Sequence, residues 1–260
     1  MFRATLLALA VGSCSGDTAQ RALPSRPPDQ LVVRVLRTYP HDASAFTQGL
    51  VYSSGRVYES TGIAGRSSVR RVRLEDGRVE TLVALPPELF GEGLARVGGK
   101  LVQLTWQNAV ALVWHLDDLR KAGAHSYQGE GWGLCYDGRR LVMSSGTDQL
   151  VFRDPETFRR TGAVTVVSGG QPVPNLNELE CTKGAVYANI WQEERIARID
   201  TDTGEVTAWI DASGLLTAEE WAAADVLNGI AYVPERDTFL LTGKFWPRLF
   251  EVKFEPRPNQ

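Results

Sequence analysis

A short motif recurs five times along the chain, and its regular recurrence limits the folds that are available. Each copy begins with a polar or aromatic residue, usually continues with glycine and ends with an aliphatic residue. The copies are Gln48-Gly49-Leu50, Glu92-Gly93-Leu94, Trp132-Gly133-Leu134, Asn177-Glu178-Leu179 and Asn228-Gly229-Ile230. Four short strands in about 40 to 45 residues is the size of one blade of a β-propeller.

The segments between these copies are typical of short strands. Runs of Val, Leu, Tyr and Thr alternate with turn signals such as Asp137-Gly138. One short helix is predicted after Thr217, which has capping-box spacing with Glu220. The last unit has three strands, and residues 31–38 are expected to supply its outer strand. We therefore expect an all-β fold, a five-bladed β-propeller over residues 31–256 closed by an N-terminal strand. A β-sandwich competes, but it does not predict such regular recurrence.

The amino-terminal residues have the pattern of a targeting segment. Arg3 precedes a short apolar stretch that ends in Val11-Gly12-Ser13-Cys14. This stretch is shorter than the roughly 18 apolar residues that span a bilayer, so it indicates a signal peptide. Small residues before a cysteine are typical of a lipoprotein signal over residues 1–13, with a lipid anchor at Cys14 and a tether over residues 14–30. Ordinary cleavage after Ala10 is the alternative. The chain is expected to be exported, as a periplasmic or cell-envelope lipoprotein that meets the membrane only through this anchor.

A lipid on Cys14 leaves Cys135 and Cys181 as the other cysteines. An oxidising compartment would allow them to pair, but neither their positions nor their spacing requires it. We expect two buried free thiols.

Charge and motif content exclude several classes of function. The chain has 28 Lys and Arg against 31 Asp and Glu, a net charge of −3, without the basic face that a nucleic-acid-binding protein needs. The three histidines lack the spacing of a metal site, and no familiar phosphate or calcium loop occurs. We therefore expect no nucleic-acid partner, no cofactor and no metal.

The repeat register predicts which side chains meet at the centre. First strands of propeller blades line the axis, so the first residues of the five copies form a ring: Gln48, Glu92, Trp132, Asn177 and Asn228. The aligned ends of the second strands are Gly62, Trp106, Gly146, Trp191 and Lys244. A lone Glu at a strand start is usually solvated and a lone Trp is usually core, but their coincidence at equivalent positions favours an aromatic-lined pocket for a small polar substrate.

Longer motifs give a resemblance to a known family. They are Ala45-Phe-Thr-Gln-Gly-Leu50, Tyr58-Glu-Ser-Thr-Gly62, Phe90-Gly-Glu-Gly-Leu94, Gln103-Leu-Thr-Trp106, Glu130-Gly-Trp-Gly-Leu134, Leu176-Asn-Glu-Leu-Glu180, Ala188-Asn-Ile-Trp191, Val226-Leu-Asn-Gly-Ile-Ala231 and Thr242-Gly-Lys-Phe-Trp-Pro247. Over roughly residues 32–254 the chain resembles the plant and bacterial glutaminyl-peptide cyclotransferases. The resemblance implies a five-bladed propeller that converts an amino-terminal glutamine of peptides or proteins to pyroglutamate and releases ammonia.

Carried over by position, the family's site falls on eight residues. They are Phe46, Gln48, Glu92, Trp106, Trp132, Asn177, Trp191 and Lys244. Only Phe46 comes from the resemblance alone, since the other seven lie in the two layers that the register selects. We expect Glu92 to shuttle a proton from the α-amine to the departing ammonia. Gln48, Asn177 and Lys244 would donate hydrogen bonds, and the aromatic residues would bind the substrate.

Two other functions remain open. A calcium-dependent propeller hydrolase, such as a lactonase, would use oxygen ligands from Glu92, Asn177 and Asn228. One carboxylate is few for Ca²⁺, and the ammonium of Lys244 would repel the ion. A non-catalytic envelope propeller that only binds peptides is the other alternative, and an inert residue at position 92 would have favoured it.

Overall fold

The computed structural model describes residue 1 and residues 27–258. The signal peptide expected at residues 1–13, the anchor at Cys14 and most of the tether expected at residues 14–30 lie outside the described residues. Within the described part of the chain, no helix is long and apolar enough to cross a membrane. The all-β class is confirmed: the elements are strands, apart from one helix of four residues.

Three antiparallel sheets of four strands follow one another along the chain, each in sequential order. The first contains β2 (Thr47–Ser53), β3 (Arg56–Thr61), β4 (Ser68–Arg73) and β5 (Val79–Ala84). The second contains β6 (Gly91–Val97), β7 (Lys100–Thr105), β8 (Val110–His115) and β9 (Lys121–Ser126). The third contains β10 (Leu134–Tyr136), β11 (Leu141–Met143), β12 (Gln149–Arg153) and β13 (Arg160–Thr165), and a small hairpin of β14 (Val167–Ser168) and β15 (Gln171–Pro172) follows it.

The remaining strands form one eight-stranded sheet that joins the two ends of the described chain. Its order is β16 (Leu176–Thr182), β17 (Ala185–Ile190), β18 (Arg195–Ile199), β19 (Val206–Asp211), β1 (Asp29–Pro40), β22 (Arg248–Pro256), β21 (Thr238–Gly243) and β20 (Leu227–Val233). The strand expected at residues 31–38 is present as β1. It pairs antiparallel with β22 and so becomes the outer neighbour of the last three strands, β20 to β22. Its first residues also pair in parallel with β19, which the sequence pattern did not predict.

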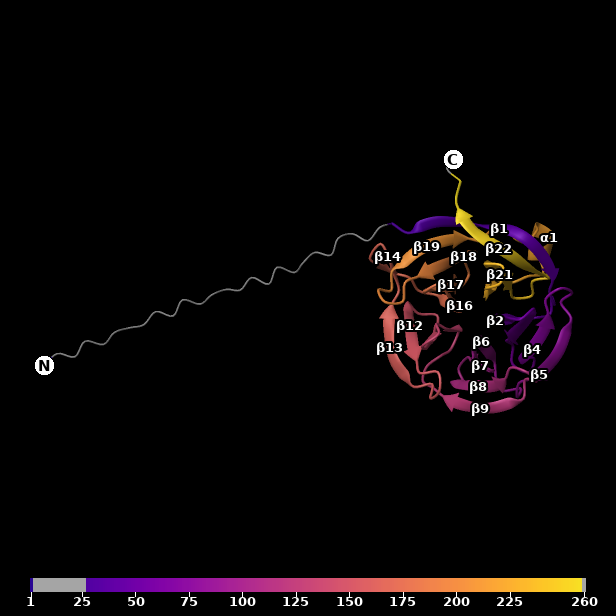
Figure 1. The fold of residues 1–260 in the computed structure, drawn as a ribbon, viewed down its shortest axis with the longest axis horizontal. Coiled ribbons are helices and arrows are strands. Elements are labelled where there is room, and N and C mark those ends of the chain that lie inside the picture. Colours follow the sequence, from indigo (N-terminus) through magenta and orange to yellow (C-terminus); the bar gives the residue numbers. More distant parts are fainter. Residues whose placement is uncertain (2–26, 259–260) are drawn as a thin grey trace.

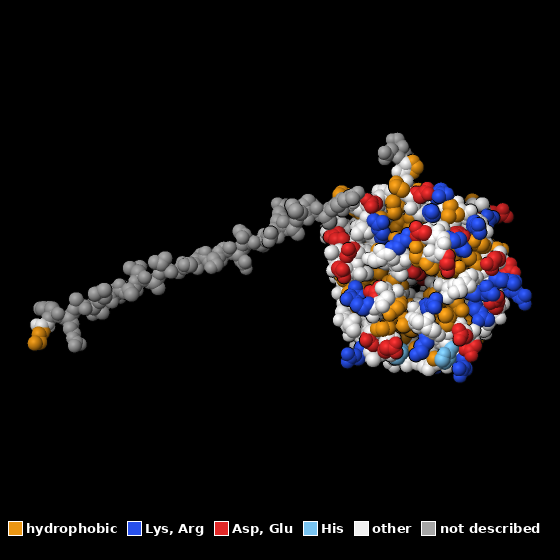
Figure 2. All heavy atoms as spheres, in the orientation of Figure 1, with side chains coloured by type: hydrophobic (Ala, Val, Ile, Leu, Met, Phe, Trp, Pro, Cys, Tyr) orange, Lys and Arg blue, Asp and Glu red, His pale blue; other side chains and the backbone are white. Residues whose placement is uncertain are grey.

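The innermost strands surround a common axis. Figure 1 shows β2, β6 and β16 near the middle of the molecule, with β5, β9 and β13 at its periphery. Each inner strand contacts the next: β2 contacts β6, β6 contacts β10, β10 contacts β16, β16 contacts β20, and β20 contacts β2. The five repeat copies therefore meet around one centre. Figure 2 shows that positive and negative side chains are interspersed over this face.

Close backbone approach explains the glycines of the repeat. A Cβ on Gly49, Gly93 or Gly133 would lie 2.4, 2.5 and 2.0 Å from a backbone atom of the next inner strand, and such contacts exclude any side chain. In the fourth copy Glu178 replaces the glycine, and its buried carboxylate accepts hydrogen bonds from the backbone N–H groups of Leu50 (3.2 Å) and Ile230 (2.8 Å). This carboxylate therefore joins three inner strands.

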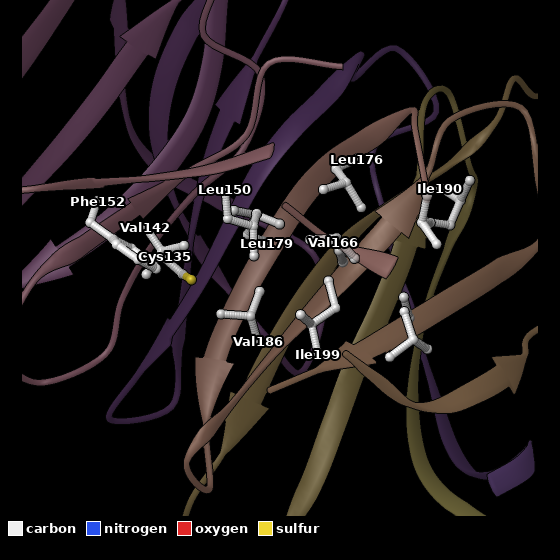
Figure 3. Packing of buried hydrophobic residues seen from close by; sticks show 14 residues of the cluster. Cys135, Val142, Leu150, Phe152, Val166, Leu176, Leu179, Val186, Ile190 and Ile199 are labelled. Carbon is white, nitrogen blue, oxygen red and sulfur yellow. The ribbon is translucent and has the colours of Figure 1, made fainter. Parts of the chain in front are cut away.

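The hydrophobic core is divided among the spaces between neighbouring sheets. Figure 3 shows one cluster in which Val142 and Leu150 of the third sheet pack with Leu179 and Val186 of the next set of strands. The expected helix is present as α1 (Ala218–Trp221), with Thr217 and Glu220 forming both hydrogen bonds of the capping box.

One expectation about the cysteines was wrong. Cys135 on β10 and Cys181 on β16 form a disulfide across neighbouring sheets, with Cα atoms 5.3 Å apart. Spacing along the chain did not predict the pair because the circular arrangement brings together two strands that are 46 residues apart in sequence.

The disulfide predicts a measurable dependence of stability on reductant. Its loop should contribute about 2–4 kcal/mol to the free energy of unfolding. Urea denaturation should therefore show that the wild type loses this part of its free energy of unfolding when its disulfide is reduced. A Cys135→Ala/Cys181→Ala variant should have the lower stability with or without reductant, and an unchanged wild-type midpoint after complete reduction would contradict the prediction.

Candidate active site

A cavity of about 510 Å³ opens where the inner strands begin and the second strands end. Its walls are aromatic and polar: Phe46, Gln48, Phe90, Glu92, Trp106, Trp132, Asn177, Trp191, Gln192, Asp225, Val226 and Lys244. All eight residues selected from the sequence therefore lie around one space. Their individual roles stay predictions.

Glu92 is a buried carboxylate at the start of β6, with 5% of its surface exposed. Its Oε1 accepts a hydrogen bond from Gln48 Nε2 at 3.0 Å, and Gln48 Oε1 accepts one from Asn228 Nδ2 at 3.0 Å. Burial raises the pKa of Glu92 well above its usual value, the charge of Lys244 opposes this, and the charge of Glu130 adds to it. Burial therefore favours the neutral form of this carboxyl group more than in an exposed glutamate.

Lys244 follows β21 and supplies the cationic group of the cavity. Its backbone is held by the segment before β20, since its N–H donates to Val226 O (3.0 Å) and its carbonyl accepts from Asp225 N (2.8 Å). The ammonium lies 4.6 Å from the centre of the Phe46 ring, a cation–π contact. Burial lowers the pKa of Lys244, and the charges of Glu92 and Asp225 partly offset that effect.

Three indoles form walls of the cavity. Trp132 and Trp191 meet edge to face with ring centres 5.5 Å apart, and Trp106 meets Phe90 in a similar way at 5.8 Å. A Cβ on Gly146 would lie 2.7 Å from the Trp132 ring, so the glycine lets this indole lie flat against the backbone. Trp106 and Trp191 are each 36% exposed, which places them at the mouth.

Asn177 contributes an unused hydrogen-bond acceptor. The residue is buried at the start of β16, and its Oδ1 has no hydrogen-bond partner within residues 27–258. A buried amide oxygen without a partner is costly, so a substrate N–H group in the cavity would stabilise it.

The structure departs from the sequence-based site in a few places. Asn228 was expected in the ring, but it lies behind Gln48 and does not line the cavity. Phe90, Gln192, Asp225 and Val226 line it without having been selected. Each lies one to three residues from an aligned position, and both Phe90 and Val226 belong to motifs that carry the family resemblance.

No group of three or more His, Cys, Asp or Glu within the described residues could hold a metal ion. The ligand set considered for calcium is also dispersed, because Asn228 is separated from the cavity by Gln48.

Comparison with known proteins identifies the family that this geometry belongs to. Residues 5–254 match the family model described as glutamine cyclotransferase. The chain belongs to the glutamine cyclotransferase family. An Arabidopsis thaliana glutaminyl-peptide cyclotransferase is 40% identical over 228 residues, covering 86% of this chain and 71% of the relative.

A solved structure of the same family has a similar fold. The crystal structure of Myxococcus xanthus glutaminyl cyclase matches with a TM-score of 0.81 and 42% identity, covering 89% of this chain and all of the other. The glutamine cyclotransferase match thus extends over the strands that carry the cavity.

Proposed function

We propose that this chain is a glutaminyl-peptide cyclotransferase, which converts the amino-terminal glutamine of peptides or proteins to pyroglutamate and releases ammonia. Membership of the glutamine cyclotransferase family supports this function. The observation that carries it is a single buried carboxyl group, Glu92, in a cavity walled by three indoles. Such a cavity fits a compact uncharged side chain.

The reaction needs one proton to move. The α-amino nitrogen bonds to the side-chain carboxamide carbon, the bond from that carbon to the amide nitrogen breaks, and ammonia leaves. Glu92 takes a proton from the attacking amine and returns it to the departing nitrogen, a role typically worth 10²–10⁴-fold in rate. Its raised pKa supports both halves of this transfer.

The other cavity residues orient the substrate. Gln48 is engaged with Glu92 and Asn228, so we assign it to holding the carboxyl group in place. Lys244 stabilises the negative charge that develops on the carboxamide oxygen, and Asn177 accepts a substrate N–H. Phe46, Trp106, Trp132 and Trp191 confine the folded glutamine side chain, which brings amine and carbonyl carbon into attack geometry.

The finer description of the fold is part of the same proposal. The circle of five inner strands supports a five-bladed propeller over residues 31–256, with β1 completing the last blade. The amino-terminal pattern supports export with a signal peptide over residues 1–13 and a lipid anchor at Cys14.

Incubation with a glutamine-initiated dipeptide tests the function directly. Ammonia and the pyroglutamyl product should appear in equal amounts, and a strong chelator should leave the rate unchanged. The same dipeptide with an acetylated amine is the control and should not react, because acetylation removes the nucleophile. Loss of activity with the chelator would favour the calcium-dependent hydrolase, and tight binding without ammonia would favour a peptide-binding protein.

A further inference from the structure

Glu130 lies in the segment between β9 and β10, outside the residues that line the cavity. Its Oε2 accepts hydrogen bonds from two indoles, Trp106 Nε1 at 2.8 Å and Trp132 Nε1 at 3.1 Å, and its Oε1 accepts one from Gln107 Nε2 at 3.1 Å. One carboxylate thus contacts two walls of the cavity that belong to neighbouring sheets.

The backbone next to Glu130 fixes where this carboxylate lies. The N–H of Gly131 donates to Trp106 O at 3.3 Å. A Cβ on Gly131 would lie 2.4 Å from the Tyr127 hydroxyl, and that hydroxyl in turn donates to the carbonyl of Thr105. The segment therefore packs directly on the end of β7, and one acceptor oxygen binds both indole N–H groups.

The charge of Glu130 also acts on the reacting carboxyl group. Hydrogen bonds from Trp132, Gln107 and Trp106 lower the pKa of Glu130, so it stays ionised. Glu92 accepts a hydrogen bond from Gln48 of β2, and the titratable groups that interact with it are Lys244 after β21, Glu130 before β10 and Tyr127 after β9. Among the charged ones, Lys244 favours the ionised form of Glu92 and Glu130 disfavours it.

We propose that Glu130 is a positioning residue of the cyclotransferase reaction, which sets the spacing of Trp106 and Trp132 and keeps a negative charge facing Glu92. This inference rests on the proposed function. It assigns two separable effects to one carboxylate: a geometric one through its two indole contacts, and an electrostatic one on the proton shuttle.

Two variants of Glu130 separate these effects. Glu130→Gln removes the charge and replaces one of the two acceptor oxygens with an NH2 donor, which cannot accept from an indole N–H or from Gln107. We expect kcat/KM for a glutamine dipeptide to fall by about 10- to 100-fold, because small misplacements of positioning groups have effects of this size. The acid limb of the pH profile of kcat/KM should move to lower pH in this variant, since a negative charge that raises the pKa of Glu92 is gone. Glu130→Asp keeps the charge with a shorter reach, so its acid limb should stay near that of the wild type while its rate falls.

Two further variants serve as a control and as a test of the contact between Glu130 and Trp106. Gln107→Ala removes only the third hydrogen bond and should behave like the wild type. Trp106→Phe removes the Nε1 donor and keeps an aromatic wall, so its loss should not add to that of Glu130→Gln in the double variant. Fully additive losses would overturn the geometric role.

The failure of this inference differs from the failure of the proposed function. An active wild type together with a Glu130→Gln variant of equal kcat/KM and unchanged acid limb would overturn the inference alone. A wild type that releases no ammonia from any glutamine dipeptide would overturn both.

Discussion

Replacing Glu92 with glutamine is expected to lower turnover of a glutamine dipeptide by 10²- to 10⁴-fold, the usual contribution of acid–base catalysis. The amide is nearly the same shape as the carboxyl group and keeps a hydrogen-bonding contact with Gln48, so the cavity should stay intact. What it loses is the ability to accept the amine's proton. The measurement is the initial rate of ammonia release under saturating substrate.

The control for this variant is Glu88→Gln, an exposed residue four positions earlier. It should retain wild-type turnover. A folded Glu92→Gln protein that keeps more than about a tenth of wild-type turnover would contradict the proton-shuttle mechanism, given the expected size of the effect.

The largest effect on stability is expected from Glu59→Gln, about 3–5 kcal/mol in the free energy of unfolding. Glu59 on β3 is fully buried and binds two buried basic side chains: its Oε2 lies 2.6 Å from Arg70 Nη2, and its Oε1 lies 3.1 Å from His41 Nε2. Thr47 also donates to Oε1 at 2.6 Å. Removing the charge of Glu59 takes the carboxylate away from His41 and leaves Arg70 paired with the partly exposed Asp42 (2.7 Å). Breaking a buried ion pair in this way is strongly destabilising, which accounts for the size of the loss.

The charges in this cluster depend on one another. Burial alone would raise the pKa of Glu59, but the charges of Arg70 and His41 outweigh it and hold that pKa well below its usual value. Burial would lower the pKa of His41, but Glu59 and the Trp246 carbonyl, 2.7 Å from Nδ1, outweigh it and raise that pKa. The contribution of Glu59 is present above about pH 4.3 and is lost as the pH falls. That of His41 is present below about pH 6.5 and is lost as the pH rises through its raised pKa.

Urea denaturation at several pH values measures both effects. The wild type should lose stability as His41 deprotonates, and Glu59→Gln should show less of this dependence because the anion that raises the pKa of His41 is absent. Glu80→Gln, which breaks an exposed pair with Arg56, is the matched control and should change stability little. Equal midpoints for Glu59→Gln and the wild type would rule out the role of the cluster.

The sequence was most informative where the repeat places residues in equivalent positions. Gln48, Glu92 and Asn177 occupy the same place in three copies, so a circular arrangement was enough to bring them to one cavity. Glu130 lies two residues before Trp132, the place that Phe46 and Phe90 take in their copies, but the alignment could not show that its carboxylate accepts from two indoles. Asp225 lies in a connecting segment whose path is set by local packing.

Other features depend on contacts between different copies. Cys135 and Cys181 occupy different positions within their repeats, so the alignment did not suggest that they meet. The ionic cluster around Glu59 joins residues on three separate segments, and nothing in their spacing distinguishes them from solvated surface charges. The sequence therefore predicts which strands surround the axis better than it predicts the polar contacts between them.

The pairing of β1 with β22 constrains how the molecule can be assembled. These strands lie at opposite ends of the described chain, yet they are hydrogen-bonded along almost their whole length. During synthesis β1 emerges first and must wait for residues near Pro256 before its antiparallel neighbour exists. Contacts between such distant segments form late and with a large entropic cost. A nascent chain stalled before β22 would therefore leave the backbone groups of β1 and β21 open to pairing with other chains.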